Sequence, residues 1–167
     1  MITDCAFTKE NKWFRYRAGA IIIENGCVLF AKNELDPYLY SVGGGIHHGE
    51  TSEEAVKREV FEETGVHYEI DRLAFIHENF FTGSGTIGNM DCHEISFYYL
   101  MKPRGSQQLG AESADHTTDT GIAEHTCWIP IEKLGDYTAF PLFLRDEIHN
   151  LDNNTIKHIT TIENCKL

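Results

Sequence analysis

Residues 44–66 read Gly-Gly-Ile-His-His-Gly-Glu-Thr-Ser-Glu-Glu-Ala-Val-Lys-Arg-Glu-Val-Phe-Glu-Glu-Thr-Gly-Val, and they predict a glycine loop followed by a helix. Thr51 is a suitable N-cap, and Glu54 three residues later completes a capping box. Gly65 stands where a left-handed C-terminal cap is expected. The residues between the caps contain no Gly or Pro and are mostly good helix formers.

One face of this predicted helix is crowded with carboxylates. Glu59, Glu62 and Glu63 are spaced i, i+3, i+4, so they share a face in the last turn, where the helix dipole favours cations. Like charges at this spacing repel one another. Oxygen ligands on one face suit a hard divalent ion such as Mg²⁺ or Mn²⁺, and Arg58 can hold a carboxylate in place. The alternative interpretation is a solvated acidic face.

The arrangement resembles the signature of the Nudix hydrolase family over 23 residues. That signature is a Gly, five residues, a Glu, seven residues, Arg-Glu, an apolar and a free residue, Glu-Glu, a free residue, Gly and an apolar residue. A weaker likeness extends to Trp128-Ile129-Pro130 and over most of the chain. Every fixed position matches, at Gly44, Glu50, Arg58-Glu59-Val60, Glu62-Glu63 and Gly65-Val66.

The resemblance implies a set of metal ligands. Glu59 and Glu63 would bind Mg²⁺ or Mn²⁺ directly, together with the carbonyl oxygen of Gly43. Glu62 would be a further ligand or would act through a neighbouring group, and Arg58 would orient the carboxylates. Such an ion neutralises a diphosphate and lowers the pKa of a bound water.

The general base that completes water activation is not fixed by the resemblance. Glu59 is one candidate. Glu124, expected in a loop just before the strand that contains Trp128, is another, because related proteins often have a carboxylate there. His93 and Glu94 are further candidates at the start of a strand.

Four residues are candidates for substrate binding. Arg15 and Arg17 fall on one face of a predicted strand, where they contact phosphates or are ordinary edge-strand charges. Gly44 lies in a run of three glycines that lets the backbone approach a ligand. Phe80 stacks on a base or is buried in the core.

The loop before the helix adds three polar residues. His47 and His48 are candidates for substrate contact, whereas Glu50 precedes the helix and is expected to have a structural role or to support the metal ligands without binding the ion directly. The subfamily markers for ADP-ribose and dinucleoside polyphosphates, a Pro and a Tyr, are absent from residues 80–84, so the resemblance names no substrate.

Composition predicts one globular domain over residues 1–167, with 41% hydrophobic and 24% charged residues. A formal net charge of −12 disfavours nucleic-acid polymers and anionic membranes as partners. No apolar run is long enough for a membrane span, and the N-terminus does not read as a signal peptide. Five scattered cysteines without CxxC spacing favour free thiols and a cytoplasmic location.

The remaining pattern predicts an α/β protein, a Nudix-like three-layer α/β/α sandwich with a mixed β-sheet. Asn25-Gly26 predicts the turn of a hairpin within residues 13–33. A final helix over residues 140–150 is expected to bury Leu142, Phe143 and Ile148. Loops are expected over residues 82–89 and 103–120, and strands over 38–42, 68–81, 94–101, 127–130 and 157–163.

Together these features predict a metal-dependent hydrolase that cleaves the pyrophosphate bond of a nucleoside diphosphate linked to another moiety, a small-molecule substrate. The alternative is a non-catalytic Nudix-fold nucleotide-binding or regulatory module. Such modules usually lose signature carboxylates, and all are present here. An isomerase that uses Cys92 as a thiol near the metal is a third possibility, and association into a homodimer is left open.

Overall fold

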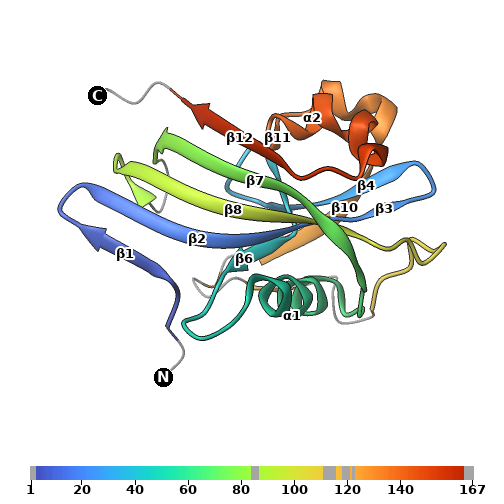
Figure 1. Cartoon of the computed structure of the whole chain (residues 1–167), viewed down its shortest axis with the longest axis horizontal. Helices are drawn as coiled ribbons and strands as arrows, with labels where there is room; N and C mark the ends of the chain where they lie inside the picture. The colour runs from blue at the N-terminus through green and yellow to red at the C-terminus, as the bar shows by residue number, and fades with distance from the viewer. Residues whose placement is uncertain (1–2, 84–86, 111–115, 118–120, 122, 164–167) are drawn as a thin grey trace.

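The computed structural model describes residues 3–83, 87–110, 116–117, 121 and 123–163. Its strands form two mixed sheets, with one helical layer on each side (Figure 1). The predicted Nudix-like α/β/α arrangement is confirmed, and the β structure is divided between two sheets. Within the described residues, no helix is long and apolar enough to cross a membrane.

The first sheet has the order β1-β2-β8-β7-β12, and β6 pairs with β2. The central strands β2 and β8 run parallel over ten residue pairs, from Lys12↔Asp91 to Ile21↔Leu100. The last strand, β12, runs parallel to β7 at one edge. The strands are β1 (Ala6–Lys9), β2 (Lys12–Ile21), β6 (Gly43–Gly45), β7 (Ile70–Thr82), β8 (Asp91–Met101) and β12 (Lys157–Ile162).

The second sheet has the order β11-β5-β4-β10-β9, and β3 pairs with β4. The chain crosses between the sheets at Ile22, which separates β2 from β3. The predicted hairpin is therefore the short β3–β4 pair, closed at Asn25 and Gly26, which both have positive φ. The strands are β3 (Ile23–Glu24), β4 (Cys27–Asn33), β5 (Leu39–Ser41), β9 (His116–Thr117), β10 (Ala123–Pro130) and β11 (Ala139–Phe140).

Helix α1 (Ser52–Thr64) has the predicted caps: Thr51 and Glu54 form the capping box, and Gly65 ends the helix at φ 66°. Its Ala55, Val56 and Val60 pack on the sheets in one apolar core. A second core lies on the other side, under three short helical segments: η2 (Ile131–Asp136), α2 (Leu144–Glu147) and η3 (Ile148–Asn153).

The predicted helix over residues 140–150 is shorter than expected, because Phe140 belongs to β11 and α2 covers only Leu144–Glu147. Ile148 is buried and Phe143 packs against the second core, as expected. Leu142 was expected inside but is 46% exposed, because it precedes α2 and faces away from that core.

The two predicted loops lie partly outside the described residues, which leave out 84–86, 111–115 and 118–120. In the first, Gly83 donates its N–H to the carbonyl of Met90 and continues the β7–β8 hairpin. In the second, the amides of Arg104 and Gly105 donate to the buried carboxylate of Glu24. The second loop also contains the short strand β9.

Candidate functional site

Strand β6 lies directly against the carboxylate face of α1. A Cβ atom placed on Gly44 would lie 2.5 Å from Oε1 of Glu59, so only glycine leaves space for that carboxylate. Gly43 has φ 133°, a conformation that side chains with a Cβ rarely adopt. The glycine run therefore brings the backbone up to the helix, whereas the sequence had predicted its approach to a ligand.

Glu63 is joined to the same strand. Its Oε1 accepts the N–H of Gly43 at 2.7 Å, and the residue is only 6% exposed. Its Oε2 is buried and has no hydrogen-bond partner among the described residues. Burial raises the pKa of Glu63 well above its usual value, and the charge of Glu124 raises it further.

Arg58 connects the carboxylates. Its guanidinium donates to both oxygens of Glu50, at 2.8 and 3.0 Å, and to Oε1 of Glu59 at 2.6 Å. It also donates to the Gly45 carbonyl at 3.0 Å and to Oε2 of Glu62 at 3.1 Å. Burial raises the pKa of Glu59, and Arg58 acts in the opposite direction. Arg58 thus fixes the direction in which Glu59 points.

Glu50 has the structural position expected of it. Besides Arg58, its carboxylate accepts the N–H of His47 at 3.0 Å. The His47 ring lies 3.5 Å from Asp4 on one side and 3.5 Å from Glu50 on the other. These contacts hold the loop between the glycines and the helix, and they tie the N-terminal segment to it.

Arg17 is buried beneath the glycine strand. It donates to the Ser41 carbonyl at 2.7 Å, the Gly43 carbonyl at 3.0 Å and Oγ of Ser41 at 3.1 Å. It also contacts the Tyr98 hydroxyl at 3.4 Å. The Gly43 carbonyl, expected as a metal ligand, therefore accepts a hydrogen bond from Arg17 in this structure.

Arg15 lies on the same face of β2 as Arg17 and is paired with a buried carboxylate. Its Nε and Nη2 donate to Oε2 of Glu94 at 2.9 and 2.7 Å. Burial acts to raise the pKa of Glu94, but Arg15, Arg17 and a hydrogen bond from Ser96 together hold that pKa below its usual range. Glu94 therefore remains ionised and is a weak base.

Glu124 comes from β10 rather than from the expected loop before it, and it pairs with Asn33 of β4. Its charge raises the pKa of Glu63. Its hydrogen bond to Tyr40, together with burial, raises the pKa of that phenol. The structure thus brings Glu124 to the helix carboxylates from the second sheet.

Glu62 lies at the exposed edge of this cluster, and Phe80 lies away from it. Glu62 has a side chain that is 52% exposed and contacts only Arg58 among the cluster residues. Phe80 is stacked on His93, with ring centroids 4.2 Å apart. Because side chains alternate along β7, Phe80 faces away from the side of the strand that carries His77, Asn79 and Phe81.

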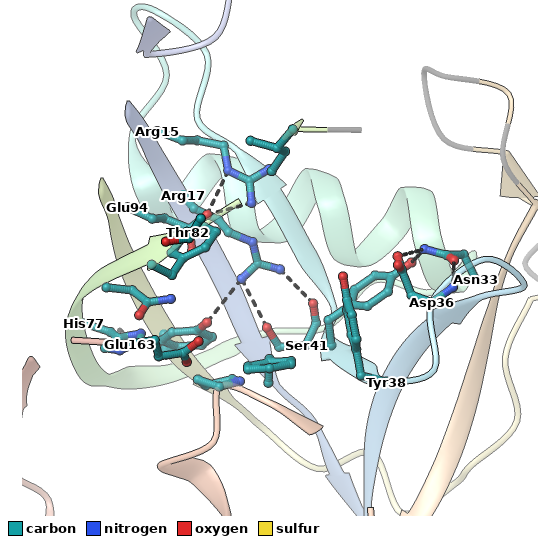
Figure 2. A pocket seen from close by; sticks show the side chains of 17 residues that line it. Arg15, Arg17, Asn33, Asp36, Tyr38, Ser41, His77, Thr82, Glu94 and Glu163 are labelled. Carbon is teal, nitrogen blue, oxygen red and sulfur yellow. Dashed lines mark hydrogen bonds and ion pairs between the residues drawn. The ribbon is translucent and has the colours of Figure 1, made fainter. Parts of the chain in front are cut away.

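A pocket of about 350 Å³ opens beside Arg15 and the buried Arg17 (Figure 2). Arg17, Tyr40 and Ser41 line it and also belong to, or touch, the carboxylate and glycine cluster. His77 and Glu163 lie at one side of the pocket, and Asp36 and Tyr38 lie at the other. A ligand in the pocket would extend toward the carboxylates of α1.

Comparison with known proteins agrees with this geometry. The model of the NUDIX domain family matches residues 13–151, which is most of the chain. The chain belongs to the Nudix family. The matched segment contains α1, β6, β10 and the pocket residues of β7, but it ends before β12.

Solved structures share the fold of this Nudix domain at low identity. The MutT protein from Bacillus halodurans is 17% identical, with TM-score 0.63, over 87% of this chain and 90% of that one. The MutT protein from Methanosarcina mazei Go1 is 20% identical, with TM-score 0.62, over 88% and 100%. A UDP-X diphosphatase is 14% identical, with TM-score 0.56, over 92% and 68%. No curated protein sequence matches the chain significantly.

The donor atoms of this Nudix domain fit a hard divalent ion. The unpartnered Oε2 of Glu63 is a carboxylate oxygen in a buried position, and Glu59 is held on the same helix face. In the part of the chain that is described, no three His, Cys, Asp or Glu side chains are placed to hold an ion together. Two carboxylates are nevertheless typical for Mg²⁺, which completes its octahedron with waters and substrate phosphates.

Sequence reasoning missed several residues of this Nudix domain. His77 and Asn79 lie on the pocket side of β7, and their period of two within an apolar strand was the signal that could have found them. No sequence pattern identified Thr161 and Glu163 as residues of the site, because nothing in the sequence shows which strand β12 pairs with. Tyr40 and Ser41 follow Pro37 in an unremarkable short strand.

Proposed function

We propose that this chain is a metal-dependent pyrophosphohydrolase, which cleaves the diphosphate of a nucleoside diphosphate linked to another moiety by attack of water at phosphorus. The observation that carries the proposal is the pair Glu59 and Glu63. Both carboxylates are largely buried against a glycine strand, and one oxygen of Glu63 has no partner among the described residues. A buried, unpartnered carboxylate oxygen is costly unless a cation satisfies it.

Glu59 and Glu63 would hold Mg²⁺ or Mn²⁺ directly, with Glu62 and the second lone pair of the Gly43 carbonyl as further ligands. When bound, the ion supplies charge neutralisation at the diphosphate and a water of lowered pKa. The ion also removes the conflict between three acidic side chains and the negative end of the helix dipole.

Arg58 would act by orientation. It fixes Glu59 through one short hydrogen bond and is itself fixed by both oxygens of Glu50. This bidentate pair gives the guanidinium one direction. A chain of Glu50, Arg58 and Glu59 therefore sets the carboxylate that would bind the ion.

Glu124 is the base that we infer. Strand β10 of the second sheet brings it near Glu63, whose pKa its charge raises. Of the alternatives, Glu94 is neutralised by Arg15 and held ionised, and His93 is enclosed between the rings of Phe14 and Phe80. Glu59 is engaged by Arg58.

Arg15 and Arg17 are less suited to the phosphate contacts first considered for them. Arg15 forms an ion pair with Glu94, and Arg17 donates to two backbone carbonyls. Their proposed role is to shape the pocket next to the diphosphate. Cys5, Cys27 and Cys127 are free thiols, which is compatible with the proposed cytoplasmic location.

The test is a screen of nucleoside diphosphate compounds with Mg²⁺ or Mn²⁺, in which phosphate is measured after alkaline phosphatase treatment. We expect turnover of at least one compound, dependent on the ion and lost in Glu59→Gln/Glu63→Gln. A protein that is stabilised by nucleotides but turns over none would instead be the non-catalytic binding module.

A further inference from the structure

The pocket beside the cluster has no excess of positive charge among its described side chains. Arg15 is paired with Glu94, and Arg17 donates to carbonyl and hydroxyl oxygens. Asp36 and Glu163 add two carboxylates to the wall. A phosphate in this pocket would meet at least as many anions as cations, so the pocket suits an uncharged group.

Two buried polar atoms in the pocket wall have no hydrogen-bond partner among the described residues. They are Nδ1 of His77, a residue that is only 4% exposed, and Oδ1 of Asn79. Burial lowers the pKa of His77 to about 4, so its ring is neutral at pH 7. Unpaired buried groups destabilise a fold, and a ligand that supplies their partners removes that cost.

Strand β12 lies next to His77, and it follows the segment matched by the family model. It pairs with β7 in parallel, and Thr161 lies 2.9 Å from Nε2 of His77. If the Thr161 hydroxyl donates to Nε2, the proton of the neutral ring is on Nδ1, so the unpartnered nitrogen of this pocket-lining residue is a donor. Asn79, two residues along the same face, presents an acceptor.

The remaining wall is aromatic. Tyr38 packs edge-on against Phe140, with ring centroids 5.2 Å apart, and Phe81 lies on the pocket side of β7. Flat, apolar surfaces of this kind favour a planar ring. The volume of about 350 Å³ lies in the range of pockets that enclose small ligands.

We propose that this pocket selects a nucleobase with an exocyclic amino group beside a ring nitrogen, the pattern of adenine and cytosine. The amino group donates to Oδ1 of Asn79, and the ring nitrogen accepts from Nδ1–H of His77, whose tautomer is set by Thr161. The bases of inosine and uridine present the reverse order of donor and acceptor and leave both groups unpaired. This inference rests on the proposed function, since it assigns the base end of the same substrate.

The first experiment compares matched pairs of substrates that differ only in the base, adenosine against inosine and cytidine against uridine. We expect kcat/KM to favour the aminated base at least about tenfold, as the loss of one buried hydrogen bond implies. Asn79→Leu should remove the preference, through a higher KM for the aminated compound. Equal kcat/KM in the wild type, or an unchanged preference in Asn79→Leu, overturns the inference.

A matched pair of strand variants tests Thr161. Thr161→Val keeps the β-branched shape and removes the hydroxyl, and Thr160→Val makes the same change on the exposed face of β12. We expect Thr161→Val to reduce the preference, Thr161→Ser to restore it and Thr160→Val to leave it unchanged. Equal losses in both valine variants would overturn the role of Thr161.

A binding measurement separates this inference from the proposed function. Adenosine and inosine, which contain no phosphate, are titrated calorimetrically into the metal-free protein. Adenosine binding about tenfold tighter than inosine supports the pocket assignment even if no diphosphate is hydrolysed. Hydrolysis without any preference between bases would overturn the pocket assignment and leave the proposed function standing.

Discussion

Oε1 of Glu63 accepts the backbone N–H of Gly43 at 2.7 Å, so the last turn of α1 and the glycine strand β6 are fixed to each other by a carboxylate. The other oxygen of that carboxylate is buried and has no partner among the described residues. One side chain therefore positions the backbone and leaves an unsatisfied ligand atom, which is a tension between stability and function.

The first prediction follows from that tension. Without metal at pH 8, Glu63→Gln should raise the free energy of unfolding by about 1–3 kcal/mol, because the amide can still accept from Gly43 and no buried charge remains. The pKa of Glu63 is raised in the fold, so the wild type gains stability as the pH falls through it. The advantage of the variant should therefore shrink toward pH 4.5.

Metal titration with thermal unfolding completes this test. Mg²⁺ or Mn²⁺ should raise the Tm of the wild type, because the ion binds the folded state, and should not raise that of Glu59→Gln/Glu63→Gln. Glu132→Gln, an exposed site on η2, is the control. Equal stabilisation of the double variant would show that the ion binds elsewhere.

The second prediction concerns Arg58→Ala. Because Arg58 contacts Glu50, Glu59 and Glu62 without being deeply buried, its loss should lower turnover by roughly 10–100-fold and leave a cooperative unfolding transition. Arg58→Lys should be intermediate, since an ammonium cannot make the bidentate pair with Glu50. An unfolded or fully active alanine variant would contradict the orienting role.

The parts of the site that the sequence predicted are those fixed by local chemistry. The capping box, the left-handed cap at Gly65 and the shared face of Glu59 and Glu63 all depend on spacing within one helix. These features needed no knowledge of which distant strands pair.

The parts that were missed depend on contacts between distant segments. Arg15 was interpreted as a phosphate contact or as an ordinary edge-strand charge, and its pairing with Glu94 depends on the parallel register of β2 and β8. Thr161 meets His77 only because β12 adds to the edge of β7. Both pairings join residues about 80 positions apart, as the separations of 79 and 84 show, and no periodicity encodes them.

The third prediction is a pH effect on stability from His77. Its pKa is lowered from 6.5 to about 4, so below pH 6.5 the unfolded chain binds a proton that the folded chain does not. This contribution to stability should be lost as the pH falls from about 6.5 to about 4. The free energy of unfolding in water, measured with urea at several pH values across that range, should depend less steeply on pH in His77→Gln than in the wild type. The exposed control His149→Gln should keep the pH dependence of the wild type. An identical pH dependence in the wild type and His77→Gln would contradict the lowered pKa of His77.

The fourth prediction is that Gly44→Ala damages the site more than the fold. Gly44 is not among the residues with positive φ, so its backbone accepts alanine, but the added Cβ would displace the Glu59 carboxylate. Displacement of about 1 Å can cost about 10²-fold in rate, and a loss of that order is expected in kcat/KM. Gly135→Ala is the control, because a Cβ there would have its nearest neighbour at 3.9 Å. Full activity in Gly44→Ala would remove Glu59 from the site.

The last prediction separates Glu124 from Glu63, two carboxylates whose charges interact. Glu63→Gln should weaken metal binding, and excess Mn²⁺ should partly restore its turnover. Glu124→Gln should lower turnover by roughly 10²–10⁴-fold with unchanged metal affinity if Glu124 is the base, because water activation then lacks its proton acceptor. Metal affinity is measured by calorimetry and turnover under saturating metal, with Glu132→Gln as the control. A lowered metal affinity in Glu124→Gln would make Glu124 a ligand. An unchanged rate would remove it from the mechanism and return the search for the base to Glu59.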